Sequence, residues 1–237
     1  MATKSVKFRH ATKWLLSPIM LKIKSGPLEG RKWKASSGIR FIKGTYEPKN
    51  VEAIQNTVRE DDIAYDVGAH VGYFAVLMGD IVGSGGRVIA FEPRGLNLGY
   101  LQKHVAVNNC ENIKIISKAL GDHSGHAKLE TRTGSGTGYV SDTGDEEIEI
   151  TSIDELVDSG TLPAPTFLKI DVEGGEMGVL RGAKNVIEKQ RPRMILATHG
   201  DDIDAECRTL LREWNYDLQD IDHESGTKEI IVTPAES

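Results

Sequence analysis

Carboxylates and one histidine follow short apolar runs of this 237-residue chain, at the point where each run ends. Asp66 closes one run, Glu92 follows the next, and Asp171 and Glu173 follow a later one, while His199 comes after the last. Carboxylate and imidazole groups are the side chains that most often move protons or bind cations in enzymes. Their repeated placement after apolar runs predicts one functional site instead of scattered surface charge.

The apolar runs are typical of strands buried on both faces, because they are nearly continuous and rich in β-branched residues. Stretches with helical periodicity lie between them, such as the apolar repeat at Leu98, Leu101 and Val105. This alternation predicts an α/β fold with a doubly wound, mostly parallel sheet that has helices on both faces. The predicted strands are 63–67, 88–91, 113–116, 167–170 and 194–197, and the predicted helices are 72–82, 98–105, one that runs on from Glu176 through Ile187, and 203–214.

Two segments depart from this alternation. Residues 131–147 are polar and glycine-rich, which predicts either a mobile loop or the tip of a hairpin. Residues 21–41 predict one or two hairpins, with turns at Gly26-Pro27 and at Gly38.

The charge is divided unevenly along the chain. Residues 1–50 hold 12 Lys or Arg and two acids, a net +10, whereas the remaining 187 residues hold 17 bases and 33 acids, a net −16. We therefore expect a basic N-terminal extension, residues 1–50, before a domain formed by residues 51–237. No apolar run approaches the roughly 18 residues that a spanning helix needs, and no signal peptide is evident, so we expect a cytoplasmic protein without integral membrane association.

The turn Asp66-Val-Gly-Ala-His-Val-Gly72 opens a helix whose amides allow close approach of a ligand. Glu92 follows the next strand, where a carboxylate suits the two hydroxyls of a ribose. The turn lacks the glycine spacing of a pyrophosphate site, and Asp66 would repel a pyrophosphate. S-adenosylmethionine, which carries a sulfonium and no phosphate, is therefore favoured over NAD. An NAD-dependent oxidoreductase and a non-catalytic cofactor-binding module remain as alternatives.

Five blocks of sequence carry a resemblance to a known family. In order, they are Asp66-Val-Gly-Ala-His-Val-Gly72, Phe91-Glu92-Pro93, Thr151-Ser152-Ile153-Asp154-Glu155-Leu156, Leu168-Lys169-Ile170-Asp171-Val172-Glu173-Gly174 and Leu180-Arg181-Gly182-Ala183. With them, the chain from about Gly44 to His199 resembles the FkbM family of S-adenosylmethionine-dependent methyltransferases. The resemblance implies a Rossmann-like, seven-stranded sheet with an antiparallel last strand, and O-methylation of a hydroxyl on a small molecule or sugar.

The resemblance also implies which residues bind the cofactor. Glu92 would bind the ribose, Ala119 and Leu120 would flank the adenine, and Asp122 would meet the adenine amino group. The methionine part would lie against Asp66, Gly68, Ala69, His70 and Gly72. Two departures from the family pattern are His70 in place of Asn, and Ala197-Thr198 where a Glu often precedes the residue equivalent to His199.

Two mechanisms fit the acidic residues at the ends of the later strands. In the first, Asp171 or His199 accepts the hydroxyl proton, with Glu173 nearby and Lys169 orienting Asp171. In the second, Asp171, Glu173 and His199, joined by Asp201, hold a divalent cation such as magnesium. Glu176 fits either this cluster or a purely structural role at a helix start.

The acceptor is the least determined part of the prediction. One interpretation is that the methyl acceptor is a small molecule or a glycan. The basic extension gives another, because its aromatic residues Phe8, Trp14, Trp33 and Phe41 lie among lysines and arginines, a composition that suits RNA or another anionic acceptor. The alternatives are that residues 1–50 pack on the acidic domain, or that Trp14 to Ile23 rests on a membrane surface. The sequence does not indicate an oligomeric state.

Overall fold

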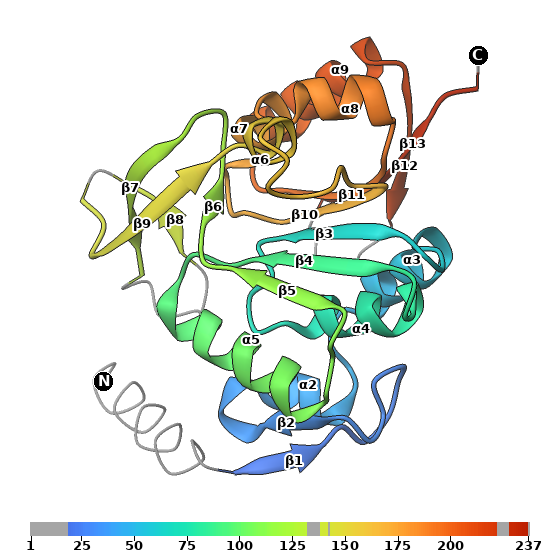
Figure 1. The fold of residues 1–237 in the computed structure, drawn as a ribbon, viewed down its shortest axis with the longest axis vertical. Coiled ribbons are helices and arrows are strands. Elements are labelled where there is room, and N and C mark those ends of the chain that lie inside the picture. Colours follow the sequence, from blue (N-terminus) through green and yellow to red (C-terminus); the bar gives the residue numbers. More distant parts are fainter. Residues whose placement is uncertain (1–18, 132–137, 142, 222–227, 237) are drawn as a thin grey trace.

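The structure, a computed structural model, describes residues 19–131, 138–141, 143–221 and 228–236. Its main feature is a seven-stranded sheet in the order β12-β13-β11-β10-β3-β4-β5, with helices on both faces (Figure 1). β13 is antiparallel to both of its neighbours, and every other neighbouring pair in this sheet is parallel. The predicted doubly wound α/β fold with an antiparallel last strand is confirmed.

The predicted strands form within one residue of their expected bounds at each end. Four of them lie inside the sheet and are buried on both faces, whereas the strand at 113–116 forms an edge and is only partly buried. The full set is β3 (Ile63–Val67), β4 (Arg87–Phe91), β5 (Ile113–Ile116), β10 (Phe167–Ile170), β11 (Arg193–Thr198), β12 (Tyr216–Ile221) and β13 (Lys228–Pro234).

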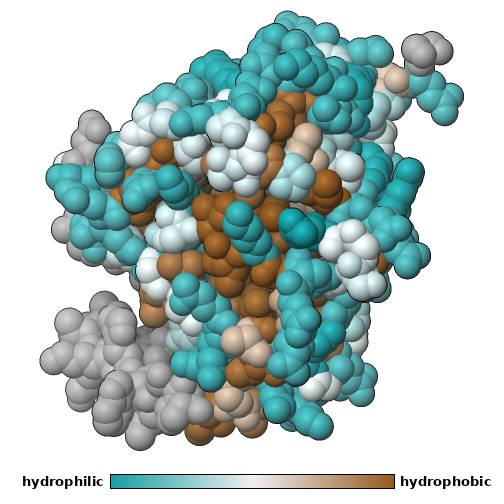
Figure 2. All heavy atoms as spheres, in the orientation of Figure 1, coloured by the Kyte–Doolittle hydropathy of each residue, from teal (hydrophilic) through white to brown (hydrophobic). Residues whose placement is uncertain are grey.

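Two hydrophobic clusters separate the sheet from its helices, one on each face. Figure 2 shows apolar side chains gathered in a band across the middle of the view, bordered by polar residues. One face carries α3 (Pro48–Thr57), α4 (Tyr73–Val82) and α5 (Gly95–Val107), and the other carries α6 (Ile153–Asp158), α7 (Glu176–Arg181), α8 (Lys184–Gln190) and α9 (Asp201–Glu213) (Figure 1). No helix in the described ranges is long and apolar enough to cross a membrane.

The prediction of a single helix after Glu176 is wrong, because two helices, α7 and α8, form there with an interruption between them. Asp154 on α6 accepts the backbone N–H groups of Asn185 and Val186 at 3.0 and 2.9 Å, and so caps the start of α8. The Asp154 N–H in turn donates to the Gly182 carbonyl at 2.8 Å. A side chain at Gly182 would also collide with the Gly121 carbonyl oxygen, 1.9 Å from its Cβ. These tertiary contacts override the helical periodicity.

The predicted hairpin in the N-terminal extension is confirmed as β1 (Met20–Lys22) and β2 (Lys32–Lys34), which pair antiparallel. The prediction of hairpin structure as far as Phe41 is wrong, since a short 3-10 turn (Ala35–Ser37) leads into helix α2 (Ile39–Lys43). A helical turn lets the neighbouring residues Phe41 and Ile42 both face the core, where they are 4% and 1% exposed. A strand would send them to opposite faces.

The described part of the extension packs on the domain. Trp33 is fully buried, and its ring stacks on His104 of α5 with centroids 3.7 Å apart. Arg31 forms an ion pair with Asp80 of α4 and donates to the Asn108 carbonyl at 3.0 Å. The rings of Trp33 and Phe41 therefore belong to the core and do not face solvent, while Phe8 and Trp14 lie outside the described residues.

A second, four-stranded sheet spans residues 119–151 and so encloses the region, 131–147, that the sequence leaves as a loop or hairpin tip. Its strands are β6 (Ala119–Leu120), β7 (Gly125–Glu130), β8 (Tyr139–Val140) and β9 (Glu146–Thr151), in the order β6-β9-β7-β8. The described parts of residues 131–147 thus include a strand, β8, that pairs with β7. Residues 132–137 and 142 lie outside the described ranges. This sheet places one wall beside the carboxyl ends of the main strands (Figure 1).

Candidate active site

A cavity of about 800 Å³ opens at the carboxyl ends of the parallel strands. Doubly wound sheets bind their ligands at this edge, beside the point where strand order reverses. The cavity wall draws on the main sheet, the small sheet and the N-terminal extension. Its lining includes Arg40, Tyr46, Glu47, Gly68, His70, Glu92, Ala119, Leu120, Val140, Asp171, Glu173, His199 and Glu229.

The turn after β3 needs its glycine for two reasons. Gly68 has φ +85°, and a Cβ there would lie 1.9 Å from the Asp171 carbonyl oxygen. The turn is anchored on the other side by the N–H groups of Gly68 and Ala69, which donate to the Phe91 carbonyl at 3.0 and 2.9 Å. The turn is thus held between the ends of β4 and β10, two segments that are distant in sequence.

Glu92 is held by backbone amides at the cavity wall. One carboxylate oxygen accepts the His70 N–H at 2.8 Å, and the other accepts the Arg94 N–H at 2.9 Å. The side chain is 5% exposed, and burial raises its pKa to about 7. Near neutral pH this carboxyl therefore exists in both protonation states.

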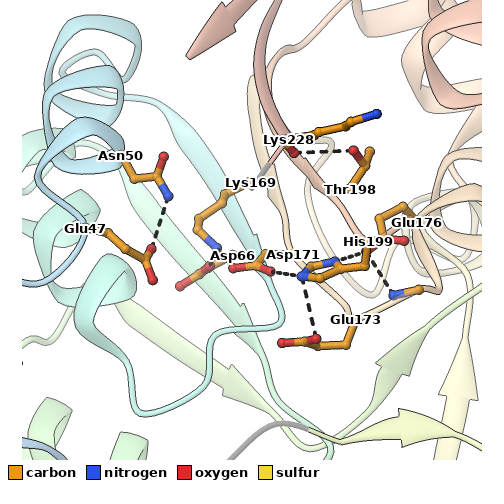
Figure 3. A network of polar contacts seen from close by, with 11 residues as sticks. Glu47, Asn50, Asp66, Lys169, Asp171, Glu173, Glu176, Thr198, His199 and Lys228 are labelled. Carbon is orange, nitrogen blue, oxygen red and sulfur yellow. Dashed lines mark hydrogen bonds and ion pairs between the residues drawn. The ribbon is translucent and has the colours of Figure 1, made fainter. Parts of the chain in front are cut away.

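A buried cation lies between two acids beneath the cavity. Lys169 Nζ is 3.1 Å from Asp171 Oδ2 and 3.8 Å from Asp66 Oδ1, and it sits over the Phe74 ring (Figure 3). Burial would lower the pKa of Lys169, but the charges of Asp171 and Asp66 outweigh it and hold the pKa above its ordinary value. Burial raises the pKa of Asp66, which is fully enclosed, to about 6.

His199 lies between acids on both of its ring nitrogens (Figure 3). Its Nδ1 is 2.7 Å from the buried Glu176 carboxylate, while its Nε2 is 3.6 Å from Glu173 and 3.8 Å from Asp171. The hydrogen bond with Glu176, reinforced by the charges of Glu173 and Asp171, raises the pKa of His199 to about 9 despite partial burial. The ring is therefore mostly protonated at neutral pH.

Asp171 is the carboxylate that links these two groups. Burial alone would raise its pKa, but Lys169 and His199 outweigh that effect and hold the pKa of Asp171 below its ordinary value. Its side chain remains 29% exposed, so the anion faces the cavity. Burial instead raises the pKa of Glu173, the other acid near His199 Nε2.

Most of the predicted site residues gather at this edge, but not all of them line the cavity. Gly68, His70, Glu92, Ala119 and Leu120 line it, as do Asp171, Glu173 and His199. Asp66, Ala69, Gly72 and Lys169 are outside its lining, although Lys169 contacts the lining residue Asp171 and lies 3.8 Å from Asp66. Asp122 is exposed, pairs with His123 at 2.6 Å, and does not line the cavity.

Sequence reasoning missed several lining residues. Arg40 comes from α2, and Tyr46 and Glu47 come from the segment between α2 and α3, where the predicted basic extension ends and the family resemblance begins. Glu229 comes from β13, far from every motif. No local pattern marks these residues, because only the folded chain brings them to the strand ends.

The hypothesis of a divalent cation finds no preformed ligand set. Across the described ranges, no group of three or more His, Cys, Asp and Glu side chains is arranged to hold a metal ion. The three proposed ligands, Asp171, Glu173 and His199, instead interact with one another.

Comparison with known proteins identifies the family. Residues 66–218 match the Methyltransferase FkbM domain. The chain belongs to the FkbM methyltransferase family. Over 152 residues this FkbM chain is 32% identical to the hexuronic acid methyltransferase AglP of Haloferax volcanii. That match spans 63% of this chain but only 61% of AglP, less than two thirds of its length.

Solved structures show the same fold. An FkbM methyltransferase from Methylobacillus flagellatus KT aligns with a TM-score of 0.55 and 17% identity, over 96% of this chain and 60% of the other. Fibrillarin from Aeropyrum pernix, with natively bound S-adenosyl-L-methionine, aligns with a TM-score of 0.50 and 15% identity, over 78% of this chain and 74% of its own. At such identities the likeness extends to the methyltransferase α/β fold.

Proposed function

We propose that this chain transfers a methyl group from S-adenosylmethionine to an oxygen atom of a sugar. Membership of the FkbM family and the hexuronic acid specificity stated for AglP support the reaction and the acceptor class. The observation that carries the proposal is the pairing, in one cavity, of a ribose-type carboxylate, Glu92, with the Asp171–His199 cluster. The first suits a nucleoside and the second suits the oxygen that is methylated.

The lining and the charge of the cofactor half of the cavity support S-adenosylmethionine as its ligand. Gly68 keeps the wall free of side-chain atoms, Glu92 offers oxygens for the ribose, and Ala119 and Leu120 offer an apolar surface for the adenine. Asp66 and Asp171 place negative charge beneath a cationic ligand. When bound, this cofactor supplies an electrophilic methyl group and leaves as a thioether that needs no proton.

His199 is the proposed proton acceptor for a hydroxyl acceptor. Glu176 binds Nδ1 and fixes the ring, so that Nε2 faces the cavity between Asp171 and Glu173. Only the neutral ring can accept a proton. With a pKa of about 9, the neutral fraction of His199 grows as the pH rises, and transfer to a hydroxyl should accelerate in the same direction.

A second candidate acceptor atom is a sugar carboxylate, which a hexuronic acid also carries. A carboxylate is already a nucleophile and needs no base. The protonated form of His199 favours this candidate, because a cation holds an acceptor anion in place. Transfer to a carboxylate should therefore decline as the pH rises through about 9 and His199 loses its charge.

One experiment tests the proposal and separates the two acceptor atoms. The chain is incubated with S-adenosylmethionine carrying a labelled methyl group and with D-glucuronate or D-glucose, from about pH 6 to about pH 10. Treating the product with mild alkali releases the label from a methyl ester but not from a methyl ether. Absence of binding to S-adenosylhomocysteine, together with absence of transfer, would rule out the proposed activity.

Incubation of the chain and the labelled cofactor with cellular extract fractions tests the remaining acceptor class, RNA. RNA, as an alternative acceptor, would appear as label that is lost when extract fractions are treated with nuclease, and its binding would weaken steeply with salt. The burial of Trp33 and Phe41 removes two of the aromatic rings on which an RNA-binding extension would depend. A glycan is therefore favoured over RNA as the acceptor.

A further inference from the structure

Glu229 lies in the same row of the sheet as Asp171. Ile170 on β10 is in register with Leu196 on β11, so Asp171, the next residue, is level with Ala197. Ala197 is in turn the partner of Glu229 on β13. Residues paired across neighbouring strands project from the same face of a sheet. The 3.1 Å contact between Asp171 and Lys169 confirms that these two side chains share a face of β10.

The residue between the two acids is small. Ala197 contributes only a methyl group, so no longer side chain fills the space between Asp171 and Glu229 within this row. Neighbouring strands are about 4.8 Å apart, which separates the backbones of Asp171 and Glu229 by about 10 Å. Both side chains line the cavity.

The ladder remains regular where these residues lie. Ala197 pairs with Glu229 and Thr198 pairs with Lys228, so β11 and β13 stay together up to their shared end. Thr198 Oγ1 lies 3.3 Å from the Lys228 carbonyl oxygen (Figure 3). Glu229 is 6% exposed, and its backbone is fixed by this pairing. A buried carboxylate on a rigid strand is a better-defined binding group than one on a loop.

We propose that Glu229 binds the acceptor, by accepting hydrogen bonds from ring hydroxyls of a sugar whose reacting oxygen lies at Asp171 and His199. The inference rests on the proposed function and adds a residue that no motif of the chain marks. Glu229 is a specificity-determining residue in this assignment, and the proton chemistry remains with His199.

The chemistry of a carboxylate defines the class of acceptor. A carboxyl group has several lone-pair sites on its two oxygens, so Glu229 can keep its protein contacts and still accept hydrogen bonds from hydroxyl groups. A buried carboxylate that loses hydroxyl partners is costly, so the site selects against acceptors poor in hydroxyls. A polyhydroxylated ring satisfies this requirement, whereas a flat apolar acceptor does not.

The test compares Glu229→Gln with Glu213→Gln, the same change on the exposed surface of α9. Methyl transfer to D-glucuronate and D-glucose is measured as KM and kcat separately, and the affinity for S-adenosylhomocysteine is measured by calorimetry. For Glu229→Gln we expect KM for the sugar to rise about 10- to 100-fold, as is typical for loss of a hydrogen bond to a charged group. The kcat and the S-adenosylhomocysteine affinity should change less than about threefold.

Monodeoxy analogues of the accepted sugar provide a readout that a merely structural role would not affect. For the analogue that lacks the hydroxyl bound by Glu229, the wild type and Glu229→Gln should have the same KM. An unchanged KM in Glu229→Gln, or an equal rise in KM for every analogue, would overturn the assignment.

Failure of the wild type to methylate either sugar while S-adenosylhomocysteine still binds would overturn the sugar site and leave methyltransferase activity standing. Loss of S-adenosylhomocysteine binding in the wild type would instead count against the proposed function itself.

Discussion

The two halves of the cavity hold their carboxylates by different means. In the cofactor half, the turn Asp66–Gly72 and Glu92 are fixed by backbone amides, and Gly68 allows no side-chain atom. In the acceptor half, Lys169, Asp171 and His199 hold one another through charge. Backbone geometry determines the arrangement of the cofactor half, so cofactor binding should be lost abruptly when the backbone is disturbed. Ionisation determines the arrangement of the acceptor half, so the rate of methyl transfer should change gradually with pH.

The largest effect should come from Gly68→Ala, which attacks the geometry of the cofactor half. Its Cβ would lie 1.9 Å from the Asp171 carbonyl oxygen, so the turn must move away from β10. We expect loss of S-adenosylhomocysteine binding in calorimetry and a fall of about 3–5 kcal/mol in the free energy of unfolding.

Gly160→Ala is the matched control, because Gly160 also has a positive φ, +69°, but has nothing within 4 Å of the added Cβ. The control should lose only about 1–2 kcal/mol. Equal effects of the two substitutions would show that the close approach to Asp171 is unimportant.

The next largest effect should come from His199→Ala in the acceptor half. We expect the rate of transfer to a hydroxyl to fall about 10²- to 10⁴-fold while S-adenosylhomocysteine binding changes little. His123→Ala, which removes an exposed imidazole outside the cavity, serves as the control.

Chelation completes the test of His199. Activity that survives exhaustive chelation but is lost in His199→Ala would remove the magnesium hypothesis. Activity lost on chelation and restored by magnesium would contradict the direct-base role and make Asp171, Glu173 and His199 metal ligands.

A moderate effect on cofactor affinity is expected from the ionisation of Glu92, the titrating carboxyl of the cofactor half. The pKa of Glu92 is raised to about 7 by burial, so its carboxyl gains a proton as the pH falls below that value. A protonated Glu92 offers a ribose fewer acceptor sites, and S-adenosylhomocysteine affinity should decline as the pH falls through 7. Glu92→Gln should bind about tenfold more weakly and lose this pH dependence. Retention of the dependence in Glu92→Gln would assign it to another group, such as Asp66.

The smallest change, and the most informative about the acceptor half, should come from Glu176→Gln. The hydrogen bond with Glu176 is the main cause of the raised pKa of His199, about 9, so its loss should lower that pKa. The limb of the pH–rate profile near pH 9 should move to lower pH by about one unit, whichever way the limb slopes. A profile that merely loses amplitude, with the limb unmoved, would mean that Glu176 supports the fold without tuning His199. Glu213→Gln should leave the limb in place.

Much of the cofactor half could be predicted from sequence because its parts are local. The turn Asp66–Gly72 and Glu92 each follow an apolar run, and parallel strands necessarily bring such ends to one edge. The predicted strands form within one residue of their expected bounds because their apolar patterns are local as well. The failures came from contacts between distant segments, such as Asp154 capping α8 and Phe41 entering the core on a helix.

The acceptor half shows what a sequence leaves open. Asp171, Glu173 and His199 could be named as neighbours, but the charge on His199 depends on Glu176 being buried against it. The assignment of the basic extension as a binding arm or a packing segment was also open, and the structure buries Trp33 against His104. Burial, which no single stretch of sequence encodes, decides both the charge on His199 and the packing of the extension on the domain.

The sequence alone determined the alternation of the five parallel strands with helices, the edge of the sheet that carries the site, and the residues of the FkbM motifs. These follow from periodicity and from local turn chemistry, which act over a few residues. The tertiary structure decided the ionisation of His199, the break between α7 and α8, and the place of Glu229 two strands from Asp171. They depend on register and burial, because a charge or a capping bond takes its strength from whichever distant groups the folded chain brings beside it.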